Sequence, residues 1–233
     1  MRLSKFISTS GYASRREADV LIQKGTVIVN NSICTDFSTE VTNEDEVIVE
    51  NTLLTLSSPR LWMINKPKGF LCTSKDPMGR KTIYELIPDR IPRVISVGRL
   101  DLNSEGLLLL TNNGELSRFF ELPKNKVERC YLVEILGSLN SKKISLLEKG
   151  LNVGGLNYGP IKVKVRKKTK QKFTLELKLQ EGKNREIRNI ASYFDWKVIR
   201  LKRTKYGDYT LGNLKERELV EVKIPELFTY STR

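Results

Sequence analysis

The 233-residue chain has no histidine, only three cysteines and no long hydrophobic run. The absence of histidine excludes Ser-His-Asp and Cys-His nucleophiles, histidine acid–base catalysis and most zinc sites. Cys34, Cys72 and Cys130 are odd in number and far apart, which argues against a disulfide scaffold and favours a reducing, cytoplasmic compartment. Apolar runs such as residues 107–110 are much shorter than the roughly 20 residues of a transmembrane helix, so we expect no membrane partner.

Acidic residues are scarce relative to basic ones, with 27 Asp and Glu against 41 Lys and Arg, a net charge of +14. A polyanionic partner is the commonest reason for such an imbalance. Residues 162–172 hold seven cations and no acid; we interpret them as a hairpin that follows phosphates, with a merely solvated tip as the alternative. Residues 1–16 loosely resemble a transit peptide, but they lead into a capped helix, which favours a folded N-terminus.

The first part of the chain is predicted to be a small module of helices and strands. Leu3, Phe6 and Ile7 have helical spacing, and Ser14 with Glu17 forms a capping box that starts a second helix ending near Gly25. The β-branched runs at residues 26–29 and 46–49 predict strands, and residues 30–31 predict a turn after the first of them. The Ser/Thr-rich segment at residues 51–60 predicts a linker.

The remainder predicts an α+β domain. Apolar runs and alternation predict strands at residues 62–64, 94–97, 107–110, 131–135, 161–165 and 173–179, the third buried on both faces, and a helix at residues 187–194. We therefore expect two domains, residues 1–58 and residues 59–233. The second is expected to be a mixed, largely antiparallel sheet with flanking helices.

Two groups of cations lie beside predicted helix starts, where phosphates bind well. One is the N-terminal face of Arg2, Lys5, Arg15 and Arg16. The other is the turn at residues 181–190, where Arg185 and Arg188 would share a helix face and could hold a phosphate or a carboxylate. For both groups, an ordinary solvated helix end is the alternative interpretation.

The loop at residues 98–106 lies between two apolar runs and carries Asp101 and Glu105. Two carboxylates in one loop could act as a glycosidase-like pair, one protonating and one attacking. They could equally be structural, because such pairs are common. The residues alone leave the role of Asp101 open.

Taken in order, these segments resemble the bacterial ribosomal-RNA pseudouridine synthases of the RsuA/RluB type. The resemblance covers nearly the whole chain. It rests on residues 2–19, which resemble a small S4-like RNA-binding module, on Lys66-Pro67-Lys68-Gly69, on Gly98-Arg99-Leu100-Asp101 with residues 104–111, and on residues 181–190. Relatives commonly carry a second arginine directly after the one at position 188, where this chain has Asn189. Residues 201–209 resemble the RluB-type, large-subunit branch of the family more than the small-subunit branch.

The resemblance implies an isomerase that breaks the N1–C1′ bond of a uridine and joins C5 to C1′ without cofactor or metal. It implies that Asp101 is essential, that Arg188 pairs with it, and that Tyr131 packs against the extruded base. The implied RNA contacts are Arg2, Lys5, Arg15, Arg16, Lys66, Arg99, Lys183 and Arg185. The implied partner is ribosomal RNA, of the large subunit for the RluB branch, or an assembly intermediate, bound by a monomer.

Two other functions remain open. A non-catalytic RNA-binding or ribosome-assembly protein could share the N-terminal module, but it would not need both Asp101 and Arg188. A glycosidase or base-excision enzyme would use water as the acceptor and would release free uracil.

Overall fold

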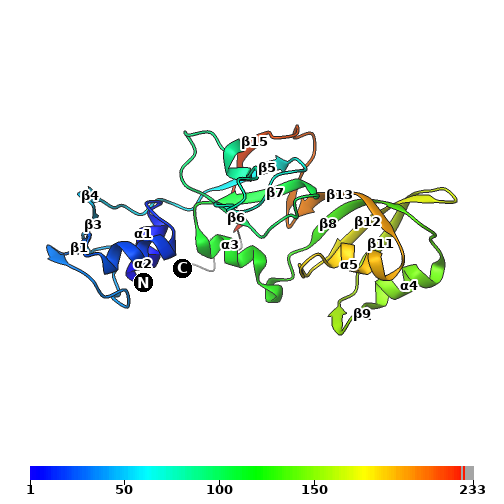
Figure 1. Cartoon of the computed structure of the whole chain (residues 1–233), viewed down its shortest axis with the longest axis horizontal. Helices are drawn as coiled ribbons and strands as arrows, with labels where there is room; N and C mark the ends of the chain where they lie inside the picture. The colour runs from blue at the N-terminus through cyan, green and yellow to red at the C-terminus, as the bar shows by residue number, and fades with distance from the viewer. Residues whose placement is uncertain (227, 229–233) are drawn as a thin grey trace.

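The computed structural model describes residues 1–226 and 228, which form an elongated molecule with a small helical and stranded module at one end (Figure 1). The module is built from α1, α2 and an antiparallel sheet of order β2-β1-β3-β4. In chain order these are α1 (Leu3–Thr9), α2 (Arg15–Gln23), β1 (Val27–Val29), β2 (Ser32–Ile33), β3 (Val47–Val49) and β4 (Thr52–Leu53).

The sequence features that predicted this module are confirmed. The Ser14 side chain accepts the Glu17 N–H while Glu17 accepts the Ser14 N–H, which closes the capping box at the start of α2. One correction concerns the linker expected at residues 51–60, because β4 belongs to the small sheet and Leu54 packs in the core of the module. Only residues 55–60 connect the module to the rest without regular structure.

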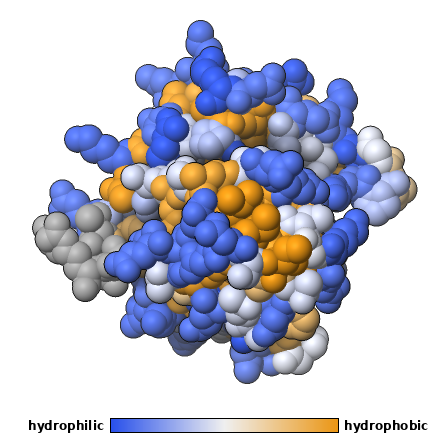
Figure 2. Space-filling view, turned by 90° about the vertical axis from the view of Figure 1, so that its left-hand side faces the viewer, coloured by the Kyte–Doolittle hydropathy of each residue, from blue (hydrophilic) through white to orange (hydrophobic). Residues whose placement is uncertain are grey.

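The outer face of the small sheet carries a row of aliphatic side chains, one on each strand. Ile33 pairs with Ile28, Ile28 with Ile48, and Ile48 with Leu53. Figure 2 looks onto this end of the molecule and shows apolar side chains gathered in the middle of the face. The opposite face packs on α1 and α2. Ile33 and Leu53 at the ends of the row are exposed, and Ile28 and Ile48 in its middle are half-buried.

The larger part of the chain is organised around a mixed sheet of order β11-β12-β8-β13-β7-β5-β15, with β6 and β14 pairing at its side. It is mainly antiparallel, and β13 pairs with β7 in parallel. Its strands are β5 (Leu61–Lys66), β6 (Ile95–Val97), β7 (Glu105–Thr111), β8 (Arg129–Leu136), β11 (Lys162–Lys168), β12 (Lys172–Leu179), β13 (Lys197–Tyr206), β14 (Tyr209–Thr210) and β15 (Leu219–Val222). The predicted α+β fold with a mainly antiparallel sheet is confirmed.

Helices and a hairpin cover parts of this sheet. They are η1 (Ile83–Leu86), α3 (Gly114–Glu121), η2 (Pro123–Asn125), α4 (Ser141–Lys149), the hairpin of β9 (Leu151–Val153) with β10 (Leu156–Tyr158), and α5 (Glu186–Tyr193). No helix in the described part of the chain is both long and apolar enough to cross a bilayer.

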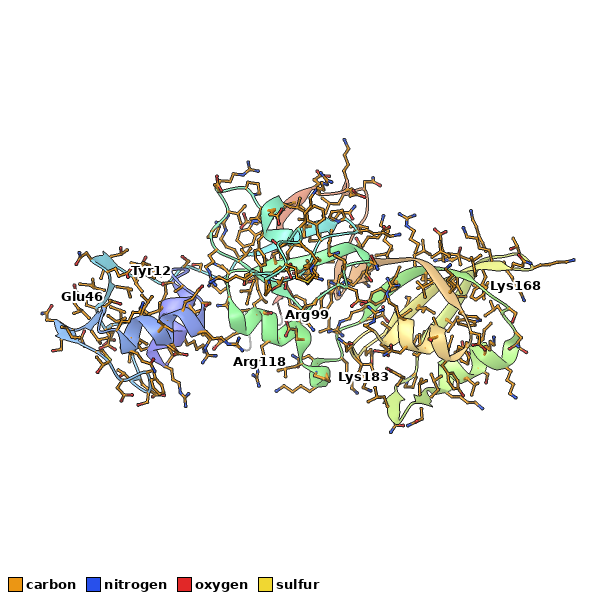
Figure 3. The ribbon with its side chains drawn as sticks, in the orientation of Figure 1. Tyr12, Glu46, Arg99, Arg118, Lys168 and Lys183 are labelled. Carbon is orange, nitrogen blue, oxygen red and sulfur yellow. The ribbon has the colours of Figure 1, made fainter. Side chains whose placement is uncertain are left out.

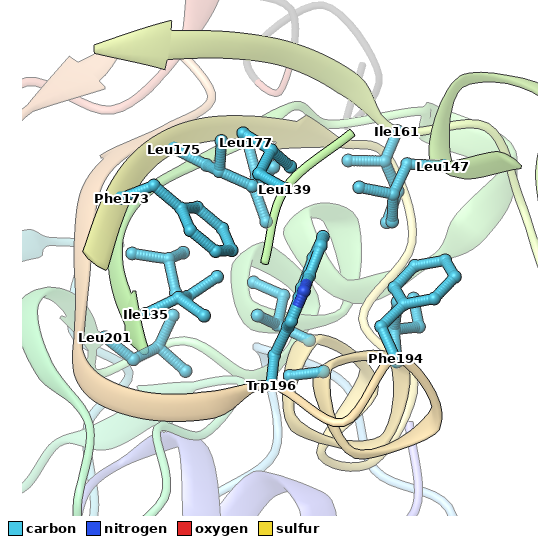
Figure 4. Packing of buried hydrophobic residues seen from close by; sticks show 14 of the residues in the cluster. Ile135, Leu139, Leu147, Ile161, Phe173, Leu175, Leu177, Phe194, Trp196 and Leu201 are labelled. Carbon is cyan, nitrogen blue, oxygen red and sulfur yellow. The ribbon is translucent and has the colours of Figure 1, made fainter. Parts of the chain in front are cut away.

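The core of the larger part is divided between the two faces of the sheet. Leu107 and Leu109 on β7 pack into one cluster, whereas Leu108 and Leu110 pack into another, so β7 is buried on both faces as predicted. A third cluster joins β8, β11 and β12 to α4 and α5, and in it the Trp196 ring contacts both Phe173 and Phe194 (Figure 4). This cluster fixes the position of α5, which carries part of the candidate site.

Candidate functional site

A cleft of about 840 Å³ opens where the loop at residues 98–104 meets the segment leading into α5. Its floor is formed by β8 and β13, and its lining includes Arg99, Asp101, Tyr131, Arg185, Arg188 and Arg203. In Figure 3, Arg99 and Lys183 lie between α3 and α5, on the same side of the molecule as Arg118.

Asp101 and Arg188, which are 87 positions apart in sequence, meet in this cleft. The Oδ2 atom of Asp101 lies 3.4 Å from Nε of Arg188 and 3.7 Å from Nη1 of Arg185. The Asp101 side chain keeps 29% of its exposure, so the carboxylate is accessible from the cleft while two guanidinium groups fix its direction. The structure thus places Arg188 beside Asp101 as the family resemblance implies, whereas the contact with Arg185 was not predicted. The chemical role of Asp101 stays a prediction.

Arg188 also ties the Asp101 loop to α5. Its Nη2 donates to the Asn103 carbonyl at 2.9 Å and to Ser104 Oγ at 3.2 Å. Burial lowers the pKa of Arg188, and the charge of Asp101 acts against this shift. A guanidinium stays protonated in proteins, so Arg188 supplies a permanent positive charge beside the carboxylate.

Arg185 differs from the sequence-based interpretation. It was expected to share a helix face with Arg188, but it precedes α5 as its N-cap residue, with φ of 50° and ψ of 27°. The left-handed backbone turns its side chain toward the same carboxylate oxygen that Arg188 faces. The two arginines that face Asp101 therefore come from different elements: Arg185 from the turn before α5, and Arg188 from α5 itself.

Lys66 was expected to contact RNA, and this prediction is wrong. Its side chain is fully buried at the end of β5. Its Nζ donates to the carbonyls of Pro67 at 3.0 Å, Ser104 at 2.8 Å and Asp101 at 3.3 Å. The ammonium therefore holds the ends of the Asp101 loop from inside, and it cannot reach a phosphate from this position.

The cleft also contains buried arginines that the sequence analysis did not select. Arg203 on β13 donates from Nε to the Leu107 carbonyl at 2.7 Å, and its Nη2 is buried without a hydrogen-bond partner among the described residues. Arg129 on β8 donates to the carbonyls of Phe120 and Gln180 and to the hydroxyl of Tyr206. Both add positive charge behind the floor of the cleft, and nothing in their local sequence distinguishes them from surface cations.

The remaining candidate residues occupy different positions around the molecule. Tyr131 is half-buried on β8 and lines the cleft between two apolar clusters. Arg99 is exposed at the cleft, and Lys183 is held by Glu181 at 2.6 Å. On the N-terminal module Arg2, Arg15 and Arg16 are exposed, whereas Lys5 forms an ion pair with Glu115 of α3. The structure therefore brings together the cleft residues and leaves the N-terminal cations as a separate surface.

Comparison with known proteins adds two family matches. Residues 60–193 match the family described as RNA pseudouridylate synthase, and residues 1–47 match the S4 domain. The chain is 49% identical to an uncharacterized RNA pseudouridine synthase of Rickettsia bellii, over 95% of this chain and 96% of that protein. It is 32% identical to ribosomal large subunit pseudouridine synthase B of Bacillus subtilis, over 97% and 95%. A crystal structure of a pseudouridylate synthase superposes with a TM-score of 0.67 at 28% identity, covering 96% of each chain.

Proposed function

The chain belongs to the RsuA/RluB family of RNA pseudouridine synthases with an S4 domain, and from that premise we propose that its substrate is a uridine in ribosomal RNA of the large subunit. The similarity to ribosomal large subunit pseudouridine synthase B over nearly the full length supports this substrate. We also propose a cytoplasmic monomer with domains at residues 1–58 and 59–233, which acts on ribosomal RNA or on an assembly intermediate.

The observation that carries the proposal is the accessible Asp101 carboxylate held by Arg188 and Arg185. Breaking the N1–C1′ bond needs an ionised carboxylate close to the sugar or the base, whether it attacks the sugar, adds to the base or removes a sugar proton. The guanidinium groups of Arg188 and Arg185 lie against this carboxylate and fix its orientation. Asp101 is therefore the group that we assign to bond cleavage.

The cleft also suits a nucleotide that has left its stack. A volume of about 840 Å³ exceeds what one nucleotide needs and falls in the range of ligand pockets. We assign Tyr131 to the face of the extruded base, where an aromatic ring offsets part of the lost stacking. Arg99 and Lys183 would meet the flanking phosphates at the mouth of the cleft.

The test is Asp101→Asn assayed with a large-subunit rRNA transcript carrying [5-³H]uridine, in which C5 substitution releases tritium. We expect pseudouridine formation to be abolished while RNA affinity stays within a few-fold of the wild type. Asp89→Asn, which changes an exposed aspartate, is the matched control and should keep full activity. Release of free uracil by the wild type would instead indicate hydrolysis, and retention of more than a few per cent of the activity by Asp101→Asn would remove Asp101 from the chemistry.

A further inference from the structure

The segment that leads from β12 into the first turn of α5 carries two carboxyl groups, Glu181 and Glu186, that have no part in the chemistry assigned above. Glu186, the first residue of α5, is only 5% exposed. Its Oε2 accepts the Lys183 N–H at 3.2 Å, whereas its Oε1 is buried and has no hydrogen-bond donor among the described residues. A buried carboxylate oxygen without a donor is costly, so the ionised form of Glu186 does not fit its surroundings.

The neighbouring Glu181 is satisfied in its ionised form. Its Oε1 accepts the Gly159 N–H at 2.7 Å, and its Oε2 accepts from Nζ of Lys183 at 2.6 Å. Burial alone would raise the pKa of Glu181, but the hydrogen bonds from Lys183, Gly159 and Glu186 outweigh it and lower the pKa. Glu181 is thus an acceptor with capacity for one further donor.

Burial, the charge of Glu181 and the hydrogen bond between the two side chains raise the pKa of Glu186 to about 7. Protonation turns the unsatisfied Oε1 of Glu186 into a donor for the Glu181 carboxylate. The two residues then share one proton, as carboxyl groups in close contact do. The shared proton thus gives Oε1 of Glu186, the oxygen of the pair without a partner, a hydrogen bond.

The pair is directly connected to the residues that face Asp101. Arg185 immediately precedes Glu186, and Arg188 lies in the first turn of α5. We propose that Glu186 is a positioning residue: in its protonated form it bonds to Glu181, closes the segment at residues 181–186, and so holds Arg185 and Arg188 against Asp101. The proposal rests on the function proposed above, because its consequence is read out in pseudouridine formation.

The charges around Glu186 explain why the closed segment depends on the proton. Glu181 and Lys183 face it from the same segment, Tyr158 of β10 lies under the Lys183 ammonium, and Arg129 of β8 lies against Gly182. The Arg129 guanidinium is already bound to carbonyls and to Tyr206. Loss of the proton leaves the buried carboxylate of Glu186 beside the partly exposed carboxylate of Glu181, with one ammonium nearby for two negative charges. Their repulsion is relieved by opening the segment.

The experiment compares the pH dependence of single-turnover tritium release from the [5-³H]uridine rRNA transcript for the wild type, Glu186→Gln and Glu186→Ala. The wild type should lose activity above pH 7, and only about one thirtieth of it should hold the proton at pH 8.5. Glu186→Gln keeps a neutral donor and should lose this alkaline decline, so that it exceeds the wild type at pH 8.5. Glu186→Ala should be about tenfold slower at pH 6.5 with RNA affinity unchanged. Glu148→Gln, an exposed glutamate on α4, should behave as the wild type.

Identical pH profiles for the wild type and Glu186→Gln, or full activity of Glu186→Ala, would overturn the proposal. A wild type without activity on the transcript would refute the proposed function instead. The pair can then be tested without RNA by the unfolding temperature: the difference between Glu186→Gln and the wild type should widen between pH 5 and pH 8, and a constant difference would exclude a shared proton.

Discussion

The buried Lys66 gives the sharpest test of how the Asp101 loop is held. We consider Lys66→Met, which keeps an unbranched side chain of similar length and removes only the ammonium. Three carbonyls, those of Pro67, Asp101 and Ser104, lose their donor. Hydrogen bonds from a charged group contribute about 1.5–3 kcal/mol each. Relief from burying the ammonium offsets roughly half of the sum, so we expect a net loss of about 3 kcal/mol.

For a chain of this length, about 3 kcal/mol corresponds to a fall of roughly 6–12 °C in unfolding temperature. Differential scanning calorimetry measures this fall, and single-turnover kinetics should show slower catalysis with RNA affinity nearly unchanged. The matched control is Lys68→Met, because Lys68 is exposed and lies 4.0 Å from Glu105. If Lys66→Met keeps its stability but weakens RNA binding and lowers the salt dependence of that binding, then Lys66 contacts a phosphate. That result would refute the role of Lys66 in holding the Asp101 loop.

Three further predictions test other parts of the account. Gly106→Ala should lower the free energy of unfolding, measured in urea, by about 3 kcal/mol, because φ at Gly106 is +98° and the new Cβ would lie 2.3 Å from the Arg203 carbonyl oxygen. The control is Gly79→Ala, where the new Cβ would meet open space, and equal losses of stability in the two variants would contradict the close approach at Gly106. The pKa of Glu186 is raised from 4.5 to about 7 in the folded protein, so the wild type loses stability as pH rises through this range. Glu186→Gln should therefore be more stable than the wild type by about 3 kcal/mol above pH 7 and equal to it below pH 4.5. A difference in stability that does not change with pH would contradict the raised pKa. Replacing Lys167, Lys168 and Lys170 by Glu should weaken RNA binding and flatten its salt dependence at unchanged unfolding temperature, and unchanged binding would show that this hairpin tip is only solvated.

Local signals predicted the elements that they specify and missed those that depend on partners distant in sequence. The capping box at Ser14 and the leucines of β7 predicted α2 and a doubly buried strand, and both are present. The ten-residue β13, in contrast, was missed. Its register shifts between Val198 and Arg200 and again after Arg203, which breaks the alternation that identifies a strand.

The candidate site shows the same division. The loop with Asp101 and the turn with Arg185 and Arg188 were identified from sequence, and the structure brings them together. The burial of Lys66 and Glu186 was not predictable, because a lysine at the end of a strand and a glutamate in the first turn of a helix are both typical of solvent-exposed positions. Lys66 is enclosed by the Asp101 loop, which is far away along the chain. Glu186 lies beside Glu181, and Glu181 is itself held by the N–H of the distant Gly159.

The central claim is that Asp101 converts a uridine of large-subunit ribosomal RNA, and mapping pseudouridines in cells tests it most directly. Ribosomal RNA would be compared between a strain lacking this gene and the same strain complemented with the wild type or with Asp101→Asn at equal protein levels. We expect one large-subunit pseudouridine to disappear on deletion, to return with the wild type and to stay absent with Asp101→Asn. Its return with Asp101→Asn, or an unchanged set of pseudouridines on deletion, would contradict the account.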